Sequence, residues 1–79
     1  VILSELSEEQ TQSLQFFVDM GLPLKEELRL DELKKNFRQL AKSLHPDFYQ
    51  NTDAATQMEV SVKFQQLYSA YNNLLGAFN

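Results

Sequence analysis

Residues 38–50 read RQLAKSLHPDFYQ, a stretch in which a helical pattern runs directly into His45-Pro46-Asp47. When the residues before His45 are placed on a helix, with about 100° of rotation per residue, they separate into two faces. Its apolar face carries Leu33, Phe37, Leu40, Ala41 and Leu44. The opposite face carries Lys34, Lys35, Arg38 and Lys42, which we call the basic strip. We predict a helix with Asp31 as its N-cap that runs through Leu44, because Pro46 disfavours helical backbone at the residue before it.

A second long helix is predicted after the proline. Residues 48–56 form a polar loop in which Asn51-Thr52-Asp53 offers turn and cap chemistry. The helix that follows begins near Ala54 or Thr56 and extends to Leu75, with Gly76 as its C-cap. Its apolar stripe, with Tyr68 at one edge, consists of Val60, Phe64, Leu67, Tyr71, Leu74 and Leu75.

A shorter helix is predicted near the start of the chain. Ser7-Glu8-Glu9-Gln10 has the spacing of a capping box, and the helix extends to about Met20. Gly21 and Pro23 end it, and residues 24–30 are a connector of unspecified structure.

These elements predict an all-α fold, because no useful stretch alternates with a period of two. The two later helices should pack as an antiparallel hairpin, apolar stripe against apolar stripe, with the first helix across them. His45-Pro46-Asp47, which we call the tip, then lies exposed at the end of the hairpin, and the basic strip leads to it along the outside.

Length and charge narrow the classes of function. The 79 residues make one small domain, and the first residue is Val1 rather than Met, which suggests a piece of a longer protein. The net charge is −4, yet residues 33–44 hold four basic residues and no acid. This pattern disfavours nucleic acid and favours a protein with an acidic patch. There is no apolar run that could span a membrane, and because there is no cysteine the redox compartment cannot be read from cysteine usage. The compartment is therefore left open, with the cytoplasm as the default expectation.

Each tip residue alone has an ordinary structural explanation. A histidine at a helix C-terminus interacts favourably with the helix dipole, a proline after it stops the helix, and an aspartate begins a turn. An enzyme is not expected, because His45 and Asp47 have no serine, cysteine or second histidine arranged beside them as nucleophile or metal ligand. We expect no metal and no cofactor.

Taken together, the tip and its flanking helices resemble the J-domain of the DnaJ co-chaperone family. That family places His-Pro-Asp between a basic amphipathic helix and an apolar partner helix. The matching segments are Phe37-Arg38-Gln39-Leu40-Ala41, Leu44-His45-Pro46-Asp47, the third-helix residues Phe64, Leu67, Ala70, Tyr71 and Leu74, and the first-helix segment Phe16–Pro23. The resemblance covers residues 14–75, which we take as the J-domain, with 1–13 as an N-terminal extension that includes the start of the first helix and 76–79 as a tail.

The resemblance implies a monomeric domain that binds a DnaK-type heat-shock chaperone and stimulates its ATP hydrolysis. The chaperone-binding residues would be His45, Pro46, Asp47, Lys34, Lys35, Arg38 and Lys42. Two departures leave alternatives open: Phe48 and Gln39 stand where the family usually has basic residues. One alternative is a J-like interaction module that does not stimulate hydrolysis. Another is an HscB-like co-chaperone for iron–sulfur cluster assembly, to which the long connector and Leu-His-Pro-Asp-Phe-Tyr are similar. The third is a helical nucleic-acid binder that uses the basic strip.

Overall fold

The computed structural model describes residues 1–78 and is helical throughout its main elements. Its three α-helices are α1 (Glu8–Asp19), α2 (Leu30–Ser43) and α3 (Ala54–Leu75). Three short 3-10 helices are η1 (Leu3–Glu5), η2 (Pro46–Tyr49) and η3 (Gly76–Phe78). The only paired extended backbone in this range is an isolated antiparallel bridge between Ile2 and Glu27. The prediction of an all-α fold is confirmed.

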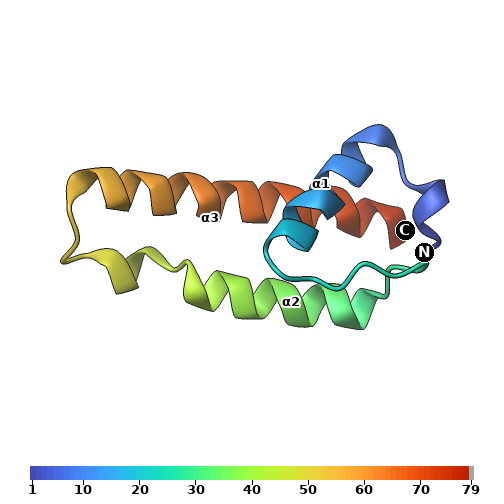
Figure 1. The fold of residues 1–79 in the computed structure, drawn as a ribbon, viewed down its shortest axis with the longest axis horizontal. Helices are drawn as coiled ribbons and strands as arrows, with labels where there is room; N and C mark the ends of the chain where they lie inside the picture. The colour runs from blue at the N-terminus through green and yellow to red at the C-terminus, as the bar shows by residue number, and fades with distance from the viewer. Residues whose placement is uncertain (79) are drawn as a thin grey trace.

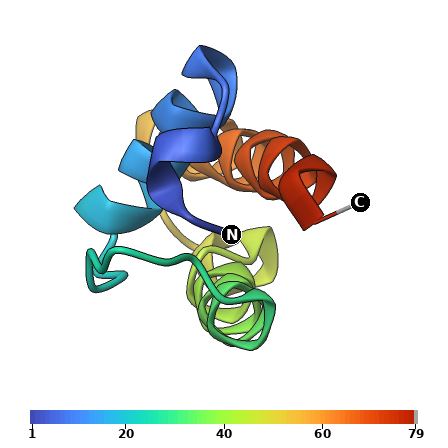
Figure 2. The ribbon, with the colours of Figure 1, turned by 90° about the vertical axis from the view of Figure 1, so that its right-hand side faces the viewer.

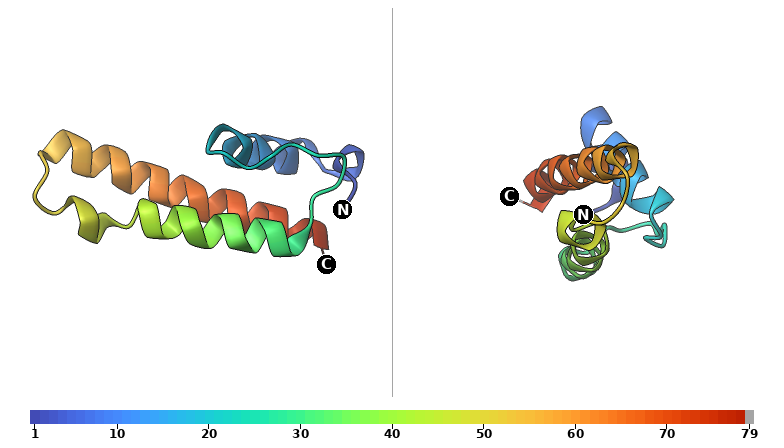
Figure 3. Two further views of the ribbon diagram at one scale, coloured as in Figure 1. Left: turned by 60° about the horizontal axis from the view of Figure 1, so that its bottom comes forward. Right: turned by 90° about the vertical axis from the view of Figure 1, so that its left-hand side faces the viewer.

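The long helices α2 and α3 run antiparallel and form a hairpin whose closed end carries η2 (Figure 1). Helix α1 lies beside α3 on one side of the hairpin, and its contact with α3 is more extensive than any other between helices (Figure 2). The connector then crosses from α1 to the start of α2 (Figure 3). None of the helices in residues 1–78 is both long and apolar enough to cross a membrane.

The core lies where the three helices meet. Four large side chains there are fully buried, with at least one from each α-helix: Phe17, Leu33, Leu67 and Leu74. The predicted stripes of α2 and α3 face one another, and the ring of Phe37 stacks on that of Tyr71 with centroids 3.9 Å apart. Burial of these stripes supplies most of the free energy that holds helices of this length in place.

Local signals fix most helix ends as the sequence predicts. Ser7 Oγ accepts a hydrogen bond from the backbone N–H of Gln10, and the Gln10 side chain accepts one from the N–H of Ser7, so the capping box is complete. Gly21 has a φ of +114°, a conformation that side chains with a Cβ rarely adopt, and α1 ends there. Asp53 caps α3 by accepting a hydrogen bond from the N–H of Thr56.

The predicted N-cap of α2 is wrong. The helix begins at Leu30 with Arg29 as N-cap, and no side chain caps it. Backbone bonds between Leu28 and Val1 hold the connector extended up to this point, which leaves Asp31 inside the first turn. There its carboxylate accepts a hydrogen bond from Arg29 Nε at 3.3 Å, which holds the pKa of Asp31 below its ordinary value.

The end of α3 also differs from expectation in its conformation. Gly76 follows the last helical residue, as predicted, but its φ of −59° is right-handed. The chain therefore does not use the special freedom of glycine there and tightens into η3 instead.

Candidate functional site

The tip leads into a regular turn, η2, whose last two residues lie in the polar loop that the sequence predicts over residues 48–56. Pro46 occupies the first position of η2, where its missing N–H and fixed φ suit a helix start. His45 is the N-cap: its carbonyl accepts a hydrogen bond from the N–H of Phe48 at 3.0 Å, and its Nδ1 accepts one from the N–H of Asp47 at 3.3 Å. The predicted polar loop thus begins with the end of η2, at Phe48 and Tyr49.

The bond between the Asp47 N–H and His45 Nδ1 assigns the imidazole proton. A nitrogen that accepts a hydrogen bond carries no proton, so the neutral ring of His45 is protonated on Nε2. Asp47 Oδ2 lies 3.4 Å from the same Nδ1 and would form an ion pair with it only if the ring gained a second proton. In the neutral state the free donor, Nε2–H, is the group of His45 that a partner could use.

The tip is exposed, as predicted. The side chains of His45 and Asp47 are 49% and 74% exposed, and no residue of η2 is buried. The imidazole is not free on all sides, however, because its ring lies edge-on against the ring of Phe64 with centroids 5.7 Å apart. Phe64 in turn contacts Tyr68, which connects the tip to the aromatic residues between α2 and α3.

The basic strip lies on the outside of α2, as predicted. All four of its side chains are exposed, and none has an acidic partner within 4.0 Å among residues 1–78. The other three cations of the chain, Lys25, Arg29 and Lys63, are each paired with a carboxylate. The strip is therefore an uncompensated positive surface on an acidic domain, and it leads along α2 to the tip.

The comparison with known families agrees with this geometry. The family model of the DnaJ domain matches residues 21–76, which is more than half of the chain and includes α2, the tip and α3. The chain belongs to the DnaJ domain family. Neither a search of curated proteins nor a search of solved structures found a match. As a J-domain, this chain is a co-chaperone module of a family whose partners are Hsp70-type chaperones.

In this J-domain, two residues to which the sequence assigned no role donate hydrogen bonds to the backbone on either side of the tip. The Tyr49 hydroxyl donates a hydrogen bond to the carbonyl of Ser43 at 3.1 Å. The Gln57 side-chain amide donates to the carbonyls of Gln50 and Thr52 at 2.9 and 3.0 Å. Tyr49 ends the Leu-His-Pro-Asp-Phe-Tyr stretch, which does not predict this bond, and Gln57 belongs to no apolar stripe or recognised motif, so only the three-dimensional arrangement identifies these contacts.

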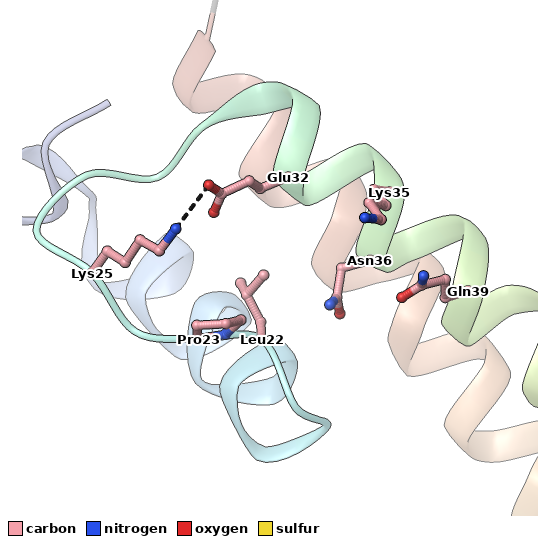
Figure 4. Close-up of a pocket in the computed structure, with 7 residues that line it drawn as sticks. All are labelled: Leu22, Pro23, Lys25, Glu32, Lys35, Asn36 and Gln39. Carbon is pink, nitrogen blue, oxygen red and sulfur yellow. Dashed lines mark hydrogen bonds and ion pairs between the residues drawn. The ribbon is translucent and has the colours of Figure 1, made fainter.

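Two surface cavities flank these features. One of about 290 Å³ lies beside the tip and is lined by Pro46, Asp47, Tyr49, Gln50 and Gln57. The other, of about 260 Å³, lies between the segment after α1 and the side of α2 (Figure 4). Lys25 and Glu32, at the second cavity, form an ion pair of 3.0 Å. Within residues 1–78 no group of three or more histidine or acidic side chains could hold a metal ion.

Proposed function

We propose that this J-domain binds a DnaK-type chaperone through its tip and basic strip, and that it stimulates ATP hydrolysis by that chaperone. One observation carries the proposal: an exposed, ordered His45-Pro46-Asp47 turn stands beside four cations that have no acidic partner in the described chain. Unpaired charges of one sign favour a partner of the opposite sign.

The two parts of the surface have different roles in this proposal. The basic strip attracts an acidic surface of the chaperone and mainly raises the association rate. Pro46 restricts the turn, which reduces the conformational entropy lost on docking. Asp47 offers a carboxylate to an arginine or to backbone donors, and such charge-assisted bonds are the stronger kind. His45 supplies the Nε2–H donor described above.

Hydrolysis itself is assigned to the chaperone. Among the described residues, His45 and Asp47 contact one another and the Gln50 amide rather than a nucleophile, and the Asp47 side chain is 74% exposed. Binding of the J-domain would instead favour the state of the chaperone that hydrolyses ATP, because a ligand shifts an equilibrium toward the state that it binds better.

The test is single-turnover ATP hydrolysis by a DnaK-type chaperone with and without the domain. We expect acceleration that is lost in His45→Gln and in Asp47→Asn, with unchanged helical circular dichroism. Asp31→Asn is the matched control, because it removes an equally exposed carboxylate at the far end of α2. Equal stimulation by the tip variants and the control would contradict the assignment.

One observation favours a second candidate, a J-like module that binds a chaperone without stimulating it. Phe48 directly follows the tip and is 67% exposed, where the family usually has a basic residue. Binding in a titration, with no change in the rate of hydrolysis, would favour this module over the first proposal.

We also propose that the functional unit is residues 14–75, acting as a monomer. The start of this range lies in α1, upstream of the family match, and the buried residues Leu14 and Phe17 tie this part of α1 to the same core. Size-exclusion chromatography with light scattering tests the monomer, and folding of a 14–75 fragment tests the boundary.

A further inference from the structure

The turn at the tip is regular although none of its side chains is fully buried. None of the residues in η2 is buried, and Phe48 points its ring into solvent with 67% of its surface exposed. Short surface segments without buried side chains ordinarily open easily, because little free energy opposes their conformational entropy. Hydrogen bonds are therefore important for holding this turn, beside the partial packing of Tyr49 and of His45 on Phe64.

Two side chains reach the turn from its two ends. Ser43 is the last residue of α2, so its carbonyl is one of those without a partner inside the helix. The Tyr49 hydroxyl donates to this carbonyl and thereby ties the last residue of η2 back to α2 across the tip. Tyr49 is half-buried, unlike its three neighbours in η2, which are exposed.

The second tie comes from α3. Gln57 lies in its first turn, and the two N–H groups of its amide donate to the carbonyls of Gln50 and Thr52. Thr52 is bonded in turn to the carbonyl of Tyr49 by its hydroxyl, at 2.6 Å, and by its N–H, at 3.2 Å. The segment 49–52 is thus joined to both helices of the hairpin and to itself.

We infer that Tyr49 and Gln57 are positioning residues that hold His45-Pro46-Asp47 in the geometry that the chaperone binds. We call the pair the tip clamp. This inference rests on the proposed function. If the turn has the binding geometry for only a fraction of the time, the apparent affinity is the intrinsic affinity multiplied by that fraction. The clamp therefore acts on the affinity for the chaperone and not on the rate of hydrolysis once the complex has formed.

The test uses two substitutions that remove a hydrogen-bonding group and keep the approximate size of the side chain. Tyr49→Phe deletes the hydroxyl, and Gln57→Met keeps the length of the side chain without its amide. The controls are Tyr71→Phe and Gln65→Met, because neither of these two polar groups forms a hydrogen bond within residues 1–78. Each variant is titrated into a DnaK-type chaperone in the single-turnover assay, which separates the half-maximal concentration from the plateau rate.

We expect Tyr49→Phe, which loses one intramolecular hydrogen bond, to raise the half-maximal concentration about three- to tenfold with an unchanged plateau rate. Gln57→Met loses two such bonds and should raise it at least as much. Amide exchange of Phe48 and Thr52 should become faster in these variants, because both N–H groups bond within the clamped turn. The controls should leave both measurements unchanged.

The outcomes separate the two levels of inference. Normal stimulation by the unaltered domain, together with unchanged half-maximal concentrations in both clamp variants, would overturn the clamp and leave the proposed function standing. A lower plateau rate at an unchanged half-maximal concentration would overturn it as well. No stimulation by the unaltered domain would overturn the proposed function, and the positioning role with it.

Discussion

Substitution of Leu67 by alanine tests the packing of the hairpin. Leu67 lies in the middle of α3 and is fully buried in the cluster that joins all three helices. Alanine removes three carbons, worth about 2.4 kcal/mol at about 0.8 kcal/mol per methylene. The cavity left behind adds to this, so we expect a loss of about 3–4 kcal/mol, within the range of about 2–5 kcal/mol measured for such substitutions.

This loss is large for a domain of 79 residues. Stabilities of about 0.05–0.15 kcal/mol per residue give such a chain a total of about 4–12 kcal/mol. At about 2.1 cal/mol/K of unfolding entropy per residue, a loss of 3 kcal/mol lowers Tm by about 18 °C. Thermal unfolding followed by circular dichroism at 222 nm measures this shift directly.

The matched control is Met58→Ala, which removes another long apolar side chain from the same helix. Met58 is 70% exposed, so its loss should change the free energy of unfolding by no more than about 0.5 kcal/mol. If Leu67→Ala lowers Tm by less than about 6 °C, which corresponds to about 1 kcal/mol in a domain of this size, the position of Leu67 at the centre of the core is refuted.

Three further predictions concern the helix ends and the basic strip. Ser7→Ala should cost about 1 kcal/mol of stability by removing the cap of α1, and a Tm equal to that of the unaltered domain would contradict this. The hydrogen bond from Thr56 holds the pKa of Asp53 in the folded domain below its ordinary value. The stability that the ionised Asp53 contributes is therefore complete above the ordinary pKa, and it is lost as the pH falls through the lower pKa of the folded state. Asp53→Asn should therefore lose less stability than the unaltered domain as pH falls below about 4, measured by thermal unfolding at each pH. Arg38→Ala should slow association with the chaperone several-fold at low salt, measured by stopped-flow binding, and the difference from the unaltered domain should shrink at high salt. Lys63→Ala is the control: it removes a cation that is already paired with a carboxylate and should not change the association rate.

The helices were predictable because their signals are local. Periodicity and caps depend on residues three or four positions apart, which is why the stripes of α2 and α3 and the capping box at Ser7 were read correctly. The exposed tip followed from the same signals, because Pro46 fixes where the helix before it must stop.

What the sequence did not reveal depends on contacts between distant residues. The N-cap of α2 is Arg29 rather than the predicted Asp31, because Leu28 is buried and bonded to Val1, 27 positions away. The tie from Tyr49 to Ser43 depends on a turn whose own geometry no motif specifies. Similarly, Gln57 looks like any exposed residue of a helix until the carbonyls of the loop are placed beside its amide.

The arrangement of the two helices of the hairpin has a consequence for anything joined to this domain. The molecule is elongated, 42 Å along its longest axis and about half as wide, with the N-terminus and η3 at the end opposite η2 (Figure 1). A neighbouring domain attached through either end would begin its path at the far pole of the rod. The fused domain would lie at one end of the molecule, and the tip at the other end would remain free to bind. The J-domain would then keep its neighbour away from the bound protein, as well as recognising that protein.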